Sequence, residues 1–160
     1  METFEQFYKQ HYLSLHRLAQ KMLCHDTAHD IVQDVFVDYF EKSKKGIKVD
    51  FPKSYLYRST LNKCIDQQRK NSKFAGDQIP EKVNNSLLEY ENRETRQCIS
   101  QCMATLGDKD RELTLLYSEG LSYKEISQIT GIPFTSIGKT LSRALKKLEK
   151  ELKVKGYELL

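Results

Sequence analysis

The chain has 160 residues and a net charge of +4 at neutral pH; 39% of its residues are hydrophobic and 30% are charged. This composition is typical of a polar globular protein with one ordinary or two small domains, and no apolar run is long enough to cross a membrane. The acidic N-terminus lacks the basic start and apolar core of a secretion signal, so we expect a cytoplasmic protein. Basic stretches at 41–73 and 121–155 alternate with acidic ones at 1–40 and 74–120, which indicates two separate nucleic-acid contacts.

The first two predicted helices, at about 3–23 and 27–42, each carry an apolar stripe at helical spacing. Thr27 is expected to cap the second of them. That helix also carries an acidic edge opposite its apolar residues, with an amide beside it: Asp30, Asp34, Asp38 and Gln33. Such an edge can dock a basic helical partner, although acidic residues at this spacing more often form a helix face that is exposed only to solvent. Nothing near the edge offers a nucleophile or a metal-ligand set, so catalysis is not expected there.

A third helix is predicted from Pro52 to about Lys70, after a basic loop that includes Lys48. Its expected core contacts are Leu56, Leu61 and Ile65. Its other positions mix aromatic, amide and cationic side chains: Tyr55, Tyr57, Arg58, Asn62, Lys63, Arg69 and Lys70. Cations hold phosphates, aromatic rings stack on unpaired bases and amides bond base edges, so this mixture favours single-stranded over duplex DNA. A surface helix with scattered tyrosines is the alternative interpretation.

Helical periodicity is lost from about residue 71 to residue 86, and we interpret this segment as a flexible linker between two helical domains. Further helices are predicted at about 87–105, 108–118, 123–130 and 134–153, without a convincing strand pattern. The predicted fold class is therefore all-α, with two small helical domains.

The segment from Leu121 to Leu148 has the pattern of a helix-turn-helix. Ser122 and Glu125 have the spacing of a capping box, Gly131 suits a turn with positive φ, and Pro133 suits a helix start. The following helix has an apolar stripe opposite a basic face, which fits a helix that enters the DNA major groove. An ordinary antiparallel helix pair with a solvated charged face is the alternative.

The four cysteines are Cys24, Cys64, Cys98 and Cys102, and they form no paired C-x-x-C motif. His25 and His29 cluster with Cys24, but a metal site needs four converging ligands. We therefore expect reduced, buried or inert thiols, and neither a metal nor another cofactor.

In their order and spacing, these segments resemble a bacterial RNA polymerase sigma factor of the extracytoplasmic-function (ECF) type, which keeps only domains two and four of the sigma-70 family. Residues 30–36 resemble region 2.2, and residues 54–58 with Asn62 and 65–66 resemble regions 2.3 and 2.4. Three short motifs resemble region 4, at 106–111, 119–126 and 131–133. The resemblance implies a region 2 domain at 1–72, a linker at 73–90 and a region 4 domain at 91–160.

The resemblance also implies a function: a promoter-specificity subunit, not an enzyme, that binds core RNA polymerase, recognises the −35 and −10 elements and promotes DNA melting. Asp30, Gln33 and Asp34 would dock on the β′ clamp helices, and the β flap is a further implied contact. The residues implied at the single-stranded −10 element are Lys48, Tyr57, Arg58, Asn62 and Lys63. Asn62 would line a pocket for a flipped-out base. The residues implied at the −35 duplex are Thr135, Lys139, Ser142, Arg143 and Lys146.

Family members are usually held inactive by an anti-sigma factor, often one inserted in the membrane, so such a partner is implied as well. Three positions depart from the family pattern. Gly138 stands where Lys or Arg is usual, Thr140 stands where Arg is often found, and Tyr55 stands where tryptophan is more usual.

Two other function classes compete with this interpretation. A dimeric transcriptional regulator that binds duplex DNA by itself would need neither the acidic edge nor the tyrosine-rich third helix. An enzyme that acts on nucleic acid would need a carboxylate–metal cluster or a positioned nucleophile, and the sequence shows neither.

Overall fold

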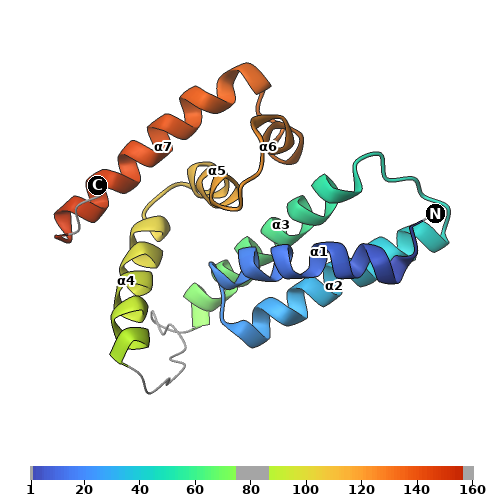
Figure 1. Ribbon diagram of the computed structural model, residues 1–160, viewed down its shortest axis with the longest axis horizontal. Coiled ribbons are helices and arrows are strands. Elements are labelled where there is room, and N and C mark those ends of the chain that lie inside the picture. Colours follow the sequence, from blue (N-terminus) through green and yellow to red (C-terminus); the bar gives the residue numbers. More distant parts are fainter. Residues whose placement is uncertain (1, 75–86, 157–160) are drawn as a thin grey trace. The chain divides into compact units, whose positions relative to one another are not determined.

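The computed structural model describes residues 2–74 and 87–156, except for the side chains of residues 73, 74, 87–93 and 96. All regular elements of the described residues are α-helices, so the all-α prediction is confirmed. Two compact units can be distinguished. The first contains α1 (Phe4–Gln20), α2 (His25–Lys44) and α3 (Pro52–Phe74), drawn from blue to green in Figure 1. The second contains α4 (Leu87–Ala104), α5 (Asp108–Ser118), the start of α6 (Tyr123–Thr130) and α7 (Phe134–Val154). Most of the predicted linker, residues 75–86, lies outside the described residues.

The first two helices begin in different ways. α1 starts at a complete capping box, in which the Gln6 backbone N–H donates to the Thr3 hydroxyl (3.2 Å) and the Thr3 N–H donates to the Gln6 side chain (2.9 Å). α2 has Cys24 at its N-cap, without a side-chain cap bond. The prediction that Thr27 caps this helix is wrong, because the helix already begins at His25 and Thr27 lies inside its first turn.

In the first unit, α1, α2 and α3 each contact the other two. Large side chains from all three helices are fully buried between them: Leu15, Leu18, Val32, Val35, Phe36, Leu56 and Leu61. The core positions expected on α3, Leu56, Leu61 and Ile65, are all buried. This apolar core is what positions the outward faces of α2 and α3.

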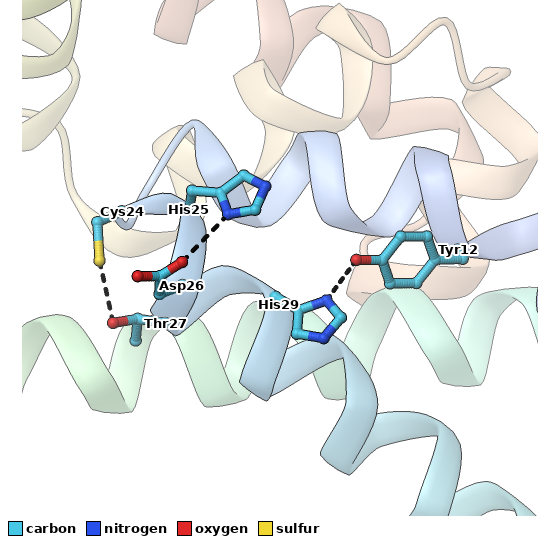
Figure 2. A network of polar contacts seen from close by, with 6 residues as sticks. All are labelled: Tyr12, Cys24, His25, Asp26, Thr27 and His29. Atoms are coloured by element: carbon cyan, nitrogen blue, oxygen red, sulfur yellow. Dashed lines mark hydrogen bonds and ion pairs between the residues drawn. The ribbon is translucent and has the colours of Figure 1, made fainter. Parts of the chain in front are cut away.

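Polar and aromatic side chains line the seam between α1 and α2 (Figure 2). The Tyr12 hydroxyl bonds Nδ1 of His29, and the Gln33 side-chain amide donates to the Tyr8 hydroxyl. Tyr8 and Tyr12 are one turn apart on α1, as His29 and Gln33 are on α2, so the two bonds form successive rungs. Asp30 and Asp34, each next in sequence to a residue of this seam, are exposed.

In the second unit, α7 packs against α4 and α5. The apolar stripe expected on α7 is Ile137, Leu141, Ala144, Leu145, Leu148 and Leu152. Four of these residues, Ile137, Leu141, Ala144 and Leu152, are buried, and Leu145 and Leu148 are partly buried. Leu152 and the partly buried Leu148 pack with Cys98 and Cys102 of α4. The opposite side of α7 is therefore left to solvent.

The helix-turn-helix forms as predicted around its turn. Both bonds of the Ser122–Glu125 capping box are present, at 3.1 and 3.2 Å. Gly131 has a φ of +77°, a conformation that costs glycine no Cβ clash. The Ser127 hydroxyl donates to the Ile132 carbonyl (2.6 Å) and ties α6 to the residues that lead into α7. Pro133 is the N-cap of α7, one position before its first helical residue.

Candidate polymerase and nucleic-acid interfaces

The acidic edge of α2 is only partly free. Asp30 and Asp34 are exposed one turn apart, as a docking edge requires. Gln33 is half-buried and holds Tyr8, while Asp38 forms an ion pair with Lys63 of α3 at 3.2 Å. The exposed carboxylates that a partner can reach directly are therefore Asp30 and Asp34.

The residues implied at the −10 element are not equally accessible. Asn62 and Lys48 are exposed, Arg58 is half-buried, and Lys63 is half-buried in its ion pair with Asp38. Tyr57 differs from the expectation, because its side chain is only 3% exposed. It lies at helical spacing from Thr60, Leu61 and Cys64, all of which are fully buried. In this structure the Tyr57 ring is thus not available to stack on a base.

Tyr55 is the tyrosine on the outward side of α3. It precedes Asn62 by seven residues, two turns of helix, so both lie on the same face. Its ring is half-buried, 5.9 Å from the Tyr39 ring between centroids, and Lys42 Nζ lies 5.0 Å from its centre. Tyr57 shares the helical spacing of Leu61 and Cys64, whereas Tyr55 does not, but the polar Thr60 interrupts the apolar pattern of that stripe in the sequence.

All five residues implied at the −35 element behave alike. Thr135, Lys139, Ser142, Arg143 and Lys146 are exposed, on the side of α7 away from its buried stripe. Two neighbours on the helix are engaged within the unit. The Thr140 hydroxyl donates to the Ser136 carbonyl (2.8 Å), and Lys147 pairs with Asp110 of α5 (2.8 Å). The face of α7 is therefore a continuous polar and cationic surface.

The thiols have no evident chemical role. Cys64, Cys98 and Cys102 are buried and Cys24 is half-buried, and all four are free. Burial raises the pKa of the Cys64 thiol to about 12. Burial, and then the neighbouring Cys98, raise the pKa of Cys102 as well. Among the described residues, no group of three or more His, Cys, Asp or Glu side chains could hold a metal ion. None of the described helices is long and apolar enough to span a membrane.

Comparison with known proteins agrees with this arrangement. The sequence matches two protein-family models, Sigma-70 region 2 at residues 7–74 and Sigma-70 region 4 at residues 96–148. The RNA polymerase sigma factor SigZ of Bacillus subtilis (strain 168) is 32% identical over 127 residues, which cover 77% of this chain and 71% of SigZ. The chain belongs to the sigma-70 family of RNA polymerase sigma factors. A second relative of this sigma factor, YlaC of the same organism, is 23% identical over 160 residues, covering 94% of this chain and 92% of YlaC.

Two solved structures share the fold of the sigma factor. CnrH, in complex with the cytosolic domain of CnrY, has a TM-score of 0.71 and 22% identity, with 94% of this chain and 88% of that chain covered. RpoE from Bartonella quintana, in complex with the anti-sigma factor NepR, has a TM-score of 0.66 and 23% identity, with 94% and 98% covered. With region 2 and region 4 domains, the sigma factor is of the ECF type. It is a non-enzymatic subunit that directs RNA polymerase to promoters for transcription initiation.

Proposed function

We propose that the sigma factor divides promoter recognition among three helices. The edge of α2 docks on the β′ clamp helices of core polymerase, α3 contacts the single-stranded −10 element, and α7 enters the major groove of the −35 duplex. The observation that carries the proposal is the uniform exposure of the five implied contacts on α7 opposite its buried stripe. A helix with one buried and one cationic face, placed second in a helix-turn-helix, is the geometry of a recognition helix.

On α7, the roles follow from the side chains that are exposed. Arg143 and Lys139 carry the charged donors that reach guanine or phosphate oxygens, and Ser142 adds a neutral one. Thr135 and Lys146 lie toward opposite ends of the face and hold phosphates on either side of the base contacts. Thr140 and Lys147 are not included among the proposed DNA contacts, because their side chains already bond other groups of the second unit.

On α3, the exposed amide of Asn62 captures an extruded base, and Arg58 and Lys48 hold the adjacent phosphates. The aromatic contact is assigned to Tyr55 rather than to Tyr57, because Tyr55 shares the outward face with Asn62 while Tyr57 is buried. The Tyr57 ring could contact DNA only after a conformational change that exposes it to solvent. Lys63 contributes through its ion pair with Asp38, which positions α3 against α2.

On α2, Asp30 and Asp34 supply the charge that a basic helical partner recognises. Gln33 is proposed as a positioning residue, because its amide is committed to Tyr8 and holds the acidic edge outward. The partner is the polymerase core, with the β flap as a further contact of the second unit. We also propose an anti-sigma factor as a partner, by analogy with the RpoE–NepR complex. The proposed site of action is the cytoplasm.

The docking assignment is tested by charge reversal. Asp34→Arg should weaken binding to purified core polymerase at least about tenfold, or 1.4 kcal/mol, because it places like charges together at the interface. Asp50→Arg is the matched control, since Asp50 is also exposed but belongs to the loop after α2. Binding is measured by fluorescence anisotropy of the labelled sigma factor, and circular dichroism verifies the fold.

Two results would contradict the proposal. Equal core affinity of Asp34→Arg and the wild type would remove the α2 edge from the docking surface. Tight, selective binding of promoter DNA by the chain without core polymerase would instead favour a self-sufficient regulator.

A further inference from the structure

Four exposed residues of α2 follow a regular spacing. Asp30, Asp34, Val37 and Glu41 are all exposed, and they are separated by four, three and four positions. This alternation keeps side chains on one face of a helix, and it is the spacing with which one helix packs along another. We call this face the exposed stripe of α2. It extends two turns of helix beyond Asp34, and therefore past the two carboxylates proposed for docking.

Val37 is the apolar member of the stripe and is 51% exposed. Single exposed apolar residues are common on protein surfaces, so exposure by itself assigns no role to this side chain. Its neighbours do, because Asp34 precedes it by three positions and Glu41 follows it by four, which places a carboxylate about one turn away on either side. An apolar centre flanked by charged groups is typical of a protein–protein contact, in which the apolar residue is buried and the rim stays polar.

Phe40 is also exposed on α2, but its ring is engaged within the first unit. It lies 4.6 Å from the Phe4 ring between centroids, and Lys44 Nζ lies 4.5 Å from its centre. Val37 belongs instead to the stripe between the carboxylates. There it adds little to the stability of the helix, because valine has a lower helix propensity than alanine and half of the residue stays in contact with water.

We propose that Val37 is the apolar anchor of the contact with core polymerase, and that Glu41 extends the acidic edge beyond it. The inference rests on the proposed function, in which α2 docks on the β′ clamp helices. The partner that fits the stripe is an amphipathic helix lying along α2, with an apolar residue against Val37 and cations one turn to either side. Val37 then contributes affinity by leaving water, while the carboxylates orient the partner and speed association.

The test separates an apolar contact from an electrostatic one. Val37→Ala removes two methyl-sized groups, each of which contributes about three- to fourfold when buried, so the affinity for core should fall roughly tenfold at every salt concentration. Glu41→Gln removes a charge at the rim. It should weaken binding about two- to fivefold at low salt and approach the wild-type affinity as salt screens the charge. Fluorescence anisotropy of the labelled sigma factor with purified core polymerase, over a series of salt concentrations, measures both.

Two further variants serve as controls. Leu13→Ala is the matched control, because Leu13 is 71% exposed but lies on α1, outside the stripe. It should keep the wild-type affinity at every salt concentration. Val37→Ile keeps a branched apolar side chain and should stay within about fourfold of the wild type, the value of one methylene group. Chemical denaturation checks the fold, and Val37→Ala should not lose stability, because alanine has the higher helix propensity.

Each alternative outcome is decisive. The inference is overturned if Val37→Ala keeps the wild-type affinity, if its loss disappears at high salt, or if Leu13→Ala loses as much. It is also overturned if Val37→Ile loses as much as Val37→Ala, or if Val37→Ala lowers the stability of the fold. Wild-type affinity of Glu41→Gln at low salt would remove Glu41 from the contact.

The proposed function fails separately. Equal core affinity of Asp34→Arg and the wild type would remove α2 from the docking surface altogether. If Asp34→Arg weakens core binding while Val37→Ala does not, docking through the acidic edge stands and the apolar anchor does not.

Discussion

α3 and α7 are both long basic helices, but they present their functional side chains differently. On α7 all five implied DNA contacts are exposed and face away from the core. On α3 the implied set is divided: Asn62 is exposed, Lys63 is tied to Asp38, and Tyr57 is buried. In the proposed function, α7 presents a preformed face to duplex DNA, whereas α3 combines DNA recognition with packing in its own unit.

The difference matches the two forms of DNA proposed as ligands. Duplex DNA is recognised by a preformed face that fits the groove, and phosphate contacts position that face. A melted strand is recognised base by base, through stacking and hydrogen bonds to individual extruded bases. A few well-placed side chains on α3 are then sufficient, and the rest of the helix can serve the core.

The largest effect is expected on α7. Arg143→Ala should weaken binding of holoenzyme to the −35 duplex by roughly five- to 150-fold, the range of 1–3 kcal/mol given by a good bidentate contact. Lys147→Ala is the control on the same helix, because Lys147 is paired with Asp110 and is not part of the proposed face. It should stay within about twofold of the wild type. An electrophoretic mobility shift assay at fixed salt measures the affinity of each variant holoenzyme for the duplex. If Arg143→Ala and Lys147→Ala lose similar affinity, the duplex is bound by the general positive charge of α7 and not by a defined face.

On α3 the expected effect is smaller and appears at a different step. Asn62→Ala should slow promoter opening by about fivefold, because the base it captures loses one set of contacts worth about 1 kcal/mol. Initial binding should change little. Asn71→Ala is the matched control, an exposed asparagine on the same helix that bonds Gln67. Permanganate footprinting of unpaired thymines measures opening, and equal opening rates in the Asn62 and Asn71 variants would contradict the base-capture role.

The two helices also differ in how well the sequence predicted them. For α6 and α7 the capping box, the Gly131 turn and the apolar stripe all depend on local spacing, and all are present in the structure. Local rules are sufficient there, because each signal involves residues within a few positions of one another.

Tyr57 shows why the same rules failed on α3. Its neighbour in the core stripe, Thr60, is polar in the sequence yet fully buried, because the Thr60 hydroxyl donates to the Leu56 carbonyl at 2.8 Å. Because that hydroxyl has a hydrogen-bond partner, Thr60 can be buried, and the whole stripe packs into the core although its sequence is partly polar. The stripe consists of Tyr57, Thr60, Leu61 and Cys64. At Thr27 the prediction failed because α2 begins at His25, two residues ahead of the expected cap, with Cys24 as its N-cap. Local spacing shows neither which polar side chain is satisfied within a buried stripe nor which of several candidate residues begins a helix.

The smallest effect concerns Gly138, where α7 lacks a side chain that its stability would favour. Glycine inside a helix costs about 1 kcal/mol relative to alanine, and its φ here is not positive, so alanine fits the backbone. The nearest neighbour of the added Cβ is the Tyr123 ring at 3.4 Å, an ordinary van der Waals distance. Gly138→Ala should therefore raise the free energy of unfolding of the second unit by up to about 1 kcal/mol, as measured by chemical denaturation, with Gly107→Ala in the α5 cap as a comparison outside a helix interior.

The opposite result is equally informative. A loss of stability in Gly138→Ala would mean that the Tyr123 ring cannot tolerate the added methyl group, and that close approach of Tyr123 to α7 is what the glycine provides.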